Sequence, residues 1–521
     1  MGRLAVAVMV SLWVIPISIL VNRIVPEPYM DEIFHMPQAQ QYCKGNFRSW
    51  DPMITTPPGL YYLSLAHATF LFPGLSYING ASSIFEVCSP VILRSVNGVL
   101  AVICSILLYE IITLLRPALD DRKATFYAVV LSMYPLHWFF TFLYYTDVAS
   151  LTAVLAMYLA CLRKSYWFSG LLGAMAVAIR QTNIIWMLFV ACSEIINITL
   201  GHQRDKIDID DASVSIRKNS QQAPENNAIL SSNLRKRIIS SKLDTGAQST
   251  HTRSSTSRIS TPVFLAFLVT LTAGLVDDII AVCLTSLHMK KKLFVAFSPF
   301  IILLVAFVAF VRWNGSVVLG AKEAHAVSLH FAQILYFGIF SALVLAPLYF
   351  SFEETINFFQ SFWKNRPHSF FQAILALIAG FISVHFFSIA HPYLLADNRH
   401  YTFYLWRKII KAYWPMKYLL VPLYVYSWLS ICTRLGKVQR KIWVLGYFLA
   451  TAAVLIPAPL IEFRYYTIPF IFLILHSHNN DIQSWVLMGF LYVALNIFTM
   501  IMFLYRPFHW DHELGTQRFI W

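Results

Sequence analysis

Long runs of apolar residues, separated by short polar stretches, set the pattern of this chain. The first run, residues 4–22, is long enough to cross a bilayer as a helix, and runs of about 17–25 residues recur to the far end of the sequence. Helices satisfy their own backbone groups in lipid, and no barrel-type alternation is visible. The pattern predicts an all-α polytopic membrane protein of about 12–14 transmembrane helices. The expected spans are 4–22, 91–115, 124–143, 147–162, 166–180, 184–200, 293–312, 331–350, 369–390, 417–433, 442–460, 465–477 and 483–505.

Two segments do not fit this pattern of simple spans. Segment 26–90 is too irregular to be plain membrane, and its apolar stretch 60–72 predicts a helix lying on the membrane surface, with a second span as the alternative. Segment 261–288 is apolar but is interrupted by Asp277-Asp278 and followed by three lysines at 290–292. It either lies on the surface or re-enters the membrane, and the sequence leaves this open.

Composition and charge agree with a membrane protein and fix its orientation. The 521 residues are 58% hydrophobic and only 13% charged, which excludes an ordinary soluble protein. The net charge of +14 suggests a nucleic-acid partner, but much of the basic excess lies in loops between spans, so we expect none. The basic residues expected on the cytosolic side are Arg116, Arg122, Lys123, Arg163, Lys164, Lys364, Arg366, Arg434, Lys437, Arg440 and Lys441.

A polar segment, 201–260, divides the chain into two membrane halves. It contains ten Lys/Arg, six Asp/Glu and no aromatic residue, a composition typical of a disordered loop, here cytosolic. We therefore expect an N-terminal membrane half, 1–200, and a C-terminal membrane half, 261–521. On this topology the segments on the non-cytosolic side are 26–90, 313–330, 391–416, 461–464 and 506–521.

The non-cytosolic segments carry the candidate chemistry. Asp31-Glu32 follow the first span, and a carboxylate there is a candidate general base, although an interfacial acidic pair that only sets topology is the alternative. On a helix the two would point about 100° apart, so only one can face a reacting group. The later segments supply arginines and histidines around 399, 464 and 518, which suit a phosphate, although single arginines at membrane edges often reach for headgroups.

Other site signals are weak or missing. The seven cysteines show no CxxC spacing; Cys43 and Cys88 share a side of the membrane, and their pairing stays open. The histidines lack the spacing of metal ligands, so we expect no metal. Two glycosylation sequons begin at Asn197 and Asn314, and only Asn314 falls on the non-cytosolic side.

Several motifs together resemble a known family. They are Tyr29-Met-Asp-Glu-Ile-Phe-His35, Trp50-Asp-Pro, Pro57-Pro-Gly-Leu-Tyr61, Ala178-Ile-Arg-Gln-Thr-Asn-Ile-Ile-Trp186, Ala396-Asp-Asn-Arg-His-Tyr-Thr-Phe-Tyr404 and the closing Arg506-Pro-Phe and Gln517-Arg-Phe-Ile-Trp521. The sequence resembles the dolichyl-phosphate-glucose-dependent alpha-1,2-glucosyltransferases of the endoplasmic reticulum, from the first span to the last residue. It departs from them in the long loop 201–260 and in Ser316, where the family pattern has glycine.

The resemblance implies a GT-C glycosyltransferase bundle in the endoplasmic reticulum membrane, with a structured luminal first loop over the active site. It implies dolichyl phosphate glucose as donor, the glucose-capped arm of a dolichyl-diphosphate-linked oligosaccharide as acceptor, inversion at the transferred sugar, and no cofactor. The implied catalytic residues are Asp31, as base, and Glu32 as second choice. The implied donor-phosphate ligands are Arg399, His400, Arg464 and Arg518, and the candidate acceptor-binding residues are His35, Gln38, Trp50 and Asp51.

Two other functions remain as alternatives. Another dolichyl-phosphate-sugar transferase, such as a mannosyltransferase, would share the acidic first loop but not the closing motif. A transporter or channel component would need broken or charged spans at mid-membrane and internal repeats. Asp147 and Asp277-Asp278 are the acids that remotely suit it, and no repeat is visible.

Overall fold

The computed structural model describes residues 1–79, 83–220, 263–349, 356, 360, 363, 366–477, 479–511 and 513–521. Regular structure in these ranges is almost entirely helical, which confirms the predicted all-α membrane class. The exception is one antiparallel pair of strands, β1 (Phe508–Trp510) and β2 (Glu513–Gln517), near the C-terminal end.

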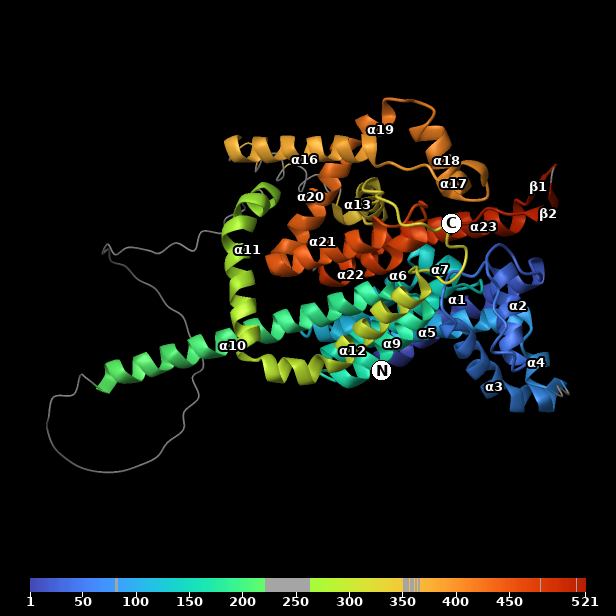
Figure 1. Ribbon diagram of the computed structural model, residues 1–521, viewed down its shortest axis with the longest axis horizontal. Helices are drawn as coiled ribbons and strands as arrows, with labels where there is room; N and C mark the ends of the chain where they lie inside the picture. The colour runs from blue at the N-terminus through green and yellow to red at the C-terminus, as the bar shows by residue number, and fades with distance from the viewer. Residues whose placement is uncertain are drawn as a thin grey trace, which may run out of the picture.

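Long apolar helices form the body of the protein and run mostly along its longest axis (Figure 1). Six in the described ranges are long and apolar enough to cross a membrane: α1 (Gly2–Ile24), α5 (Pro90–Leu115), the first part of α10 (Asn183–Ser220), α12 (Lys290–Asn314), α19 (Met416–Leu419) continued by α20 (Val421–Val438), and α23 (Ile482–Tyr505). Shorter apolar helices lie among them: α8 (Thr146–Leu162), α9 (Tyr166–Ile179), α13 (Ala332–Val344), α16 (Arg366–Phe386), α21 (Lys441–Leu455) and η2 (Phe463–Tyr466) with α22 (Thr467–His476).

One expected span is broken in two. The run 124–143 forms α6 (Asp121–Ser132) and α7 (Pro135–Phe140) instead of one helix. Pro135 lacks a backbone N–H and disfavours helical geometry in the residue before it, so the chain turns there and starts a new helix with the proline in its first turn. The prediction of a continuous span was wrong at this point, and the break places Tyr145, at the start of α8, beside the first loop.

The first loop folds into three helices, α2 (Glu32–Cys43), α3 (Gly59–Asn79) and α4 (Ile84–Val87). α3 is not among the helices that are long and apolar enough to cross a membrane, which favours the predicted surface helix over a second span. A disulfide between Cys43 and Cys88, which the sequence left open, ties the end of α2 to the residue after α4.

The expected non-cytosolic segments meet at one end of the bundle. Leu319 N–H donates to Thr55 O (3.1 Å) and Ala321 N–H to Pro52 O (3.0 Å), so segment 313–330 lies against the first loop. Short elements from the C-terminal half complete this end: α17 (Pro392–Ala396), α18 (Tyr401–Leu405) and η1 (Trp406–Ile410). A β-bridge joins His400 to Ile520. This is the grouping that the charge pattern predicts.

The opposite end carries the residues expected in the cytosol. Lys164 pairs with Glu194 at 2.7 Å, and Arg440 pairs with Asp278 at 3.5 Å. The Asp278 pair fixes α11 (Val263–His288), the helix in the segment that the sequence could not place. α11 contacts α10, α16, α20 and α21 and runs across these helices rather than along them, as Figure 1 shows, which favours a surface helix. α10 stays helical to Ser220, inside the expected loop 201–260, of which 221–260 lies outside the described residues.

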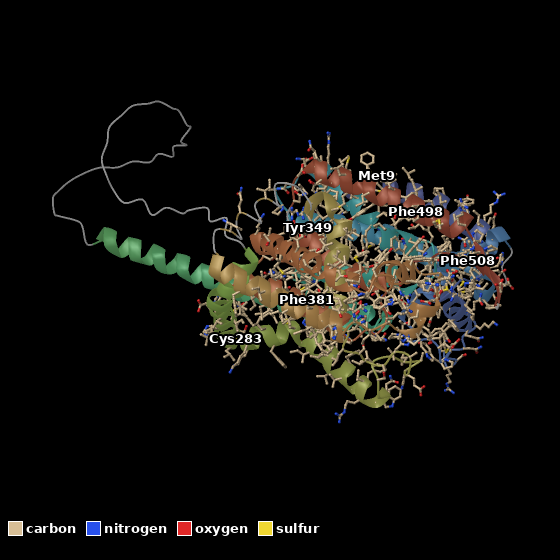
Figure 2. The ribbon with its side chains drawn as sticks, turned by 90° about the horizontal axis from the view of Figure 1, so that it is seen from above. Met9, Cys283, Tyr349, Phe381, Phe498 and Phe508 are labelled. Atoms are coloured by element: carbon tan, nitrogen blue, oxygen red, sulfur yellow. A yellow bond between two sulfur atoms is a disulfide. The ribbon has the colours of Figure 1, made fainter. Side chains whose placement is uncertain are left out.

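Aromatic side chains fill the space between the helices, and apolar side chains also cover the outside. Tyr134 stacks on Phe470 with ring centroids 4.3 Å apart. The short helix α14 (Ala346–Tyr349) follows α13 and packs against α23. Met9, Phe381 and Phe498 lie on the outer surface (Figure 2) and are exposed. Exposed apolar side chains around a bundle of long apolar helices are what contact with lipid requires.

Candidate active site

A cavity of about 230 Å³ opens where the non-cytosolic segments meet. Its walls come from every one of those segments and from the start of α8, so residues far apart in the sequence face the same space. The lining residues are Met30, Asp31, Phe34, His35, Met53, Ile54, Thr55, Phe140, Tyr145, His325, Tyr393, Leu394, Asp397, His400, Thr402, Leu460, Ile461, Glu462, Arg464, Ile520 and Trp521.

Asp31 is the acid of the first loop that faces this cavity. It caps the N-terminus of α2, after Met30, whose φ of 56° is rare for a residue with a side chain. Its Oδ2 accepts a hydrogen bond from Arg464 Nη1 at 2.7 Å, and its backbone N–H donates to the Tyr145 hydroxyl at 3.2 Å. Burial is the largest single influence and would raise the pKa of the Asp31 carboxyl, but the Arg464 guanidinium, together with His35 and His400, holds that pKa below its usual value.

Glu32 points the other way, into the core. Its side chain is fully buried, and Arg94 on α5 donates to both of its oxygens, at 2.9 and 2.6 Å. The same carboxylate accepts the backbone N–H groups of Tyr29 (3.0 Å) and Tyr144 (2.6 Å). All the acceptor capacity of Glu32 is therefore spent on holding neighbouring loops, which departs from its prediction as second choice for the base.

Arg464 joins two carboxylates across the cavity wall. Besides Asp31, it pairs through Nε with Glu462, two residues earlier in the chain. Burial would raise the pKa of Glu462, but Arg464 holds it below its usual value. The result is a row of carboxylate, guanidinium and carboxylate, open to the cavity on the Asp31 side, where the side chain is 37% exposed.

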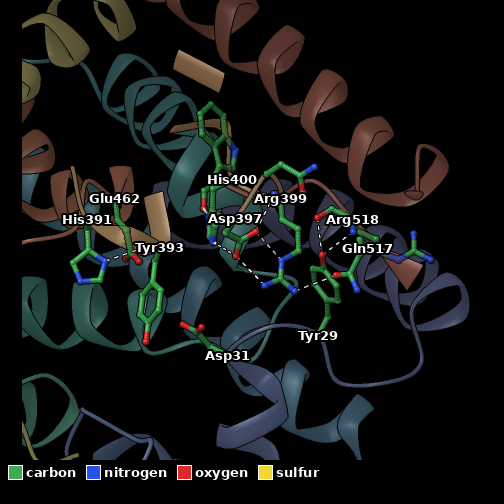
Figure 3. A network of polar contacts seen from close by, with 12 residues as sticks. Tyr29, Asp31, His391, Tyr393, Asp397, Arg399, His400, Glu462, Gln517 and Arg518 are labelled. Carbon is green, nitrogen blue, oxygen red and sulfur yellow. Dashed lines mark hydrogen bonds and ion pairs between the residues drawn. The ribbon is translucent and has the colours of Figure 1, made fainter. Parts of the chain in front are cut away.

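A second cluster faces Asp31 from the loop between α17 and α18. Figure 3 shows Asp397 between His400 and Arg399. Arg399 donates to both oxygens of Asp397 at 2.8 Å, and its Nη1 donates to Gln517 Oε1 at 3.0 Å. His400 lines the cavity and meets Trp521 O through Nδ1 at 3.0 Å. Of the predicted phosphate ligands in this loop, His400 reaches the cavity, whereas Arg399 lies behind Asp397 and holds it in place.

Arg518 serves the end of a helix and not the cavity. Its Nη1 donates to the carbonyl oxygens of Phe503 (2.8 Å) and Leu504 (3.0 Å), which are unpaired acceptors in the last turn of α23. Its backbone N–H donates to the Tyr29 hydroxyl at 2.7 Å, which ties the C-terminal segment to the first loop (Figure 3). The prediction that Arg518 binds the donor phosphate therefore does not fit this placement. The sequence could not reveal it, because it does not show that the end of α23 lies beside Arg518.

Among the candidate acceptor-binding residues only His35 lines the cavity. Its Nδ1 lies 2.6 Å from the Tyr61 hydroxyl. Gln38 is buried and bridges Ser49 O and the backbone N–H of Asp51, at 2.7 and 2.9 Å. Asp51 accepts the backbone N–H of Met53, and Trp50 packs beside Tyr61. Gln38, Trp50 and Asp51 therefore shape the first loop from outside the cavity.

The structure also brings in residues that sequence reasoning did not select. Glu462 and Asp397 each lie two residues before a selected arginine, so a search for carboxylates beside those arginines finds them. Tyr145 gave no signal, because its role depends on the turn at the start of α8. In the described part of the chain no group of three His, Cys, Asp or Glu side chains is arranged to hold a metal ion.

Fold and site together define a polytopic helical membrane protein with two acid–arginine clusters around one open cavity. The comparisons with known proteins narrow this class: a model of the DIE2/ALG10 family matches residues 25–475, and the chain belongs to that family. No solved structure matches it.

The curated relatives match over nearly their whole lengths. A protein of Arabidopsis thaliana is 58% identical over 100% of both chains, and one of Mus musculus is 34% identical over 96% of this chain and 94% of its own. A protein of Drosophila melanogaster is 28% identical over 98% of this chain and 97% of its own. All three carry the name Dol-P-Glc:Glc(2)Man(9)GlcNAc(2)-PP-Dol alpha-1,2-glucosyltransferase.

Proposed function

We propose that this protein is a dolichyl-phosphate-glucose-dependent alpha-1,2-glucosyltransferase. It would transfer glucose to Glc(2)Man(9)GlcNAc(2)-PP-Dol, the acceptor in the names of its relatives. The observation that carries the proposal is Asp31 at an open cavity, within hydrogen-bond distance of Arg464, at one end of a helical membrane bundle. The family match over residues 25–475 supports it. The finer assignment is the endoplasmic reticulum membrane with the cavity on the luminal side, where the terminal glucose is added before transfer of the oligosaccharide to protein.

The proposed reaction is a single in-line displacement. The acceptor hydroxyl attacks C1 of glucose, its proton passes to the Asp31 carboxylate, and the bond from C1 to the phosphate oxygen breaks with inversion. Dolichyl phosphate leaves with the bonding electrons, beside Arg464 and His400, which offer donors to its oxygens. When the donor phosphate competes for Arg464, the guanidinium no longer lowers the pKa of Asp31 as strongly, so binding makes the carboxylate a better base.

The alternatives have less support. The relatives of Arabidopsis, mouse and Drosophila all carry a glucosyltransferase name, which does not favour a mannosyltransferase. Asp147, one of the acids that a transporter would need in mid-membrane, is paired with Arg180 at 2.9 Å. Asp278 is paired with Arg440 at the other end of the bundle.

The direct test supplies the full chain to microsomes that lack the native activity, with dolichyl phosphate glucose and the diglucosylated lipid-linked oligosaccharide. We expect one added glucose per acceptor, removable by a glucosidase specific for the alpha-1,2 linkage. Dolichyl phosphate mannose serves as the control donor. Folded wild-type protein that transfers no glucose, or that prefers the mannose donor, would overturn the proposal.

Removing the cation at the cavity should weaken donor use more than acceptor use. Arg464→Ala deletes the guanidinium that faces Asp31, and loss of a charge-assisted bond to phosphate is expected to raise the KM for donor by about 10-fold or more. Arg407→Ala removes another cation of the same end, one that lies over the Phe403 ring outside the cavity lining, and should leave both KM values unchanged. Equal losses of donor and acceptor use in Arg464→Ala would show a structural role instead.

A further inference from the structure

Negative charge exceeds positive charge in the cavity wall. Three carboxylates line it, Asp31, Asp397 and Glu462, against one arginine, Arg464. Arg464 is already shared between two of those carboxylates, and Arg399 is committed to the third. A phosphate that enters this site needs a further cation, because an anion taken out of water beside carboxylates is otherwise repelled.

Arg180 lies just behind the cavity lining and is placed to supply that charge. It follows the last residue of α9, and the next residue, Gln181, donates through Nε2 to the cavity-lining Thr55 O at 3.0 Å. Its guanidinium carbon lies 6.0 Å from the centre of the Tyr465 ring, and that of Arg464 lies at the same distance from the same ring. The two guanidinium groups therefore share one aromatic neighbour.

Most of the hydrogen-bonding capacity of Arg180 is unused. Nη1 donates to Asp147 Oδ1 at 2.9 Å. In the described part of the chain Nε and Nη2 have no partner, and neither is among the buried atoms without one, so both keep access to solvent. Arg180 therefore has N–H donors available for a ligand. Arg399 and Arg518 instead donate to Asp397, Gln517 and the end of α23.

Asp147 orients Arg180 through one hydrogen bond and leaves its other N–H donors available. It stands in the first turn of α8, two residues after Tyr145, whose hydroxyl accepts the Asp31 backbone N–H. The start of α8 thus fixes both the candidate base and Arg180. Asp147 is buried and binds one nitrogen of the fork, leaving the remaining face of the guanidinium for a second anion.

We propose that Arg180 is a second phosphate-binding residue of the donor site, next to the Tyr465 ring that it shares with Arg464, with Asp147 as its positioning partner. This inference rests on the proposed function, since the anion is the phosphate of the donor and of the dolichyl phosphate product. The inference also gives a role to the Ala178–Trp186 motif, which contains Arg180 and has no other assigned function.

Dolichyl phosphate isolates this subsite, because it keeps the phosphate and lacks the sugar. In microsomes carrying the full chain, its inhibition constant against the donor is measured for wild type and for Arg180→Met, with the KM for acceptor as the second readout. We expect the inhibition constant to rise roughly 10- to 100-fold, from the loss of one or two charge-assisted bonds, with little change in the acceptor KM. An unchanged inhibition constant in an enzyme that still transfers glucose would overturn the inference but not the function.

A variant of the partner residue Asp147 should not weaken inhibition, and it covers the case in which Arg180→Met does not fold. Asp147→Asn keeps the volume and the Oδ1 acceptor that orients Arg180 but removes the charge that competes with a phosphate, so dolichyl phosphate should inhibit as strongly as in wild type or more strongly. If the pair only stabilises the fold, Asp147→Asn should instead weaken inhibition or lower the amount of folded protein, and that outcome would contradict the proposal. If wild-type protein transfers no glucose at all, the proposed function fails. The two variants test the inference separately, because both are compared with an active wild type.

Discussion

Asp31→Asn is expected to abolish glucose transfer while leaving the protein folded. The amide keeps the size of the carboxylate and can still accept a bond from Arg464, but it cannot take the proton of the attacking hydroxyl. General-base catalysis contributes typically 10²–10⁴-fold, so kcat should fall by about that factor with little change in the KM for donor. Initial rates of glucose transfer at saturating donor and acceptor measure this directly.

The control for this variant is an acid of the same loop that lies outside the cavity. Asp51→Asn removes a carboxylate that accepts the Met53 backbone N–H at 2.8 Å, and its transfer rate should stay within a few-fold of wild type. A wild-type rate in Asp31→Asn would refute the base assignment. Equal losses in both variants would point to the shape of the first loop and not to proton transfer.

The sequence was sufficient for the class of fold and for the end of the bundle that carries the site. Long apolar runs predict helices, and the basic loops predict which segments share a side, because both signals are local and strong. The break at Pro135 was also local, but the hydrophobic run 124–143 hid it, since a run of apolar residues looks the same whether the chain turns or continues.

Choosing between neighbouring charged residues needed the structure. Helix periodicity showed that Asp31 and Glu32 could not both face the site, but the choice depends on Arg94, 62 residues further along the chain. Arg399, Arg464 and Arg518 all stand in the expected non-cytosolic segments. They differ in what they contact, because Arg399 pairs with Asp397 and Arg518 binds the last turn of α23. Such contacts are made between distant segments, so no spacing in the sequence encodes them.

The buried pair of Glu32 and Arg94 explains why Asp31 is held in one position. Arg94 is 2% exposed, and besides Glu32 it donates to Val25 O (2.5 Å) and to Glu27 O (3.0 Å), the connection between α1 and α2. Asp31 lies within the chain that these bonds fix at both ends. Because each bond crosses from α5 to the first loop, the pair transmits the position of a membrane helix to the candidate base.

Breaking that pair should cost more stability than any exposed ion pair of the protein. Glu32→Gln leaves the Arg94 guanidinium buried without a counter-charge, which is expected to destabilise the fold by about 3–5 kcal/mol. Arg3→Gln is the matched control, because Arg3 is 66% exposed and its buried partner Glu110 keeps Arg163 as a second counter-charge, so its loss should cost at most about 1 kcal/mol. Unfolding midpoints in nanodiscs at one lipid composition compare the two, and equal midpoints would contradict the argument.

A double variant separates stability from positioning. Glu32→Met with Arg94→Met removes both charges, so no buried charge is left unpaired and much of the lost stability should return. Glucose transfer should stay low even so, because the bonds from Arg94 to Val25 O and Glu27 O are gone and the connection that carries Asp31 is no longer fixed. If the double variant recovered stability and full transfer together, the pair would serve the fold alone, and the position of Asp31 would have to depend on Tyr145 and Arg464.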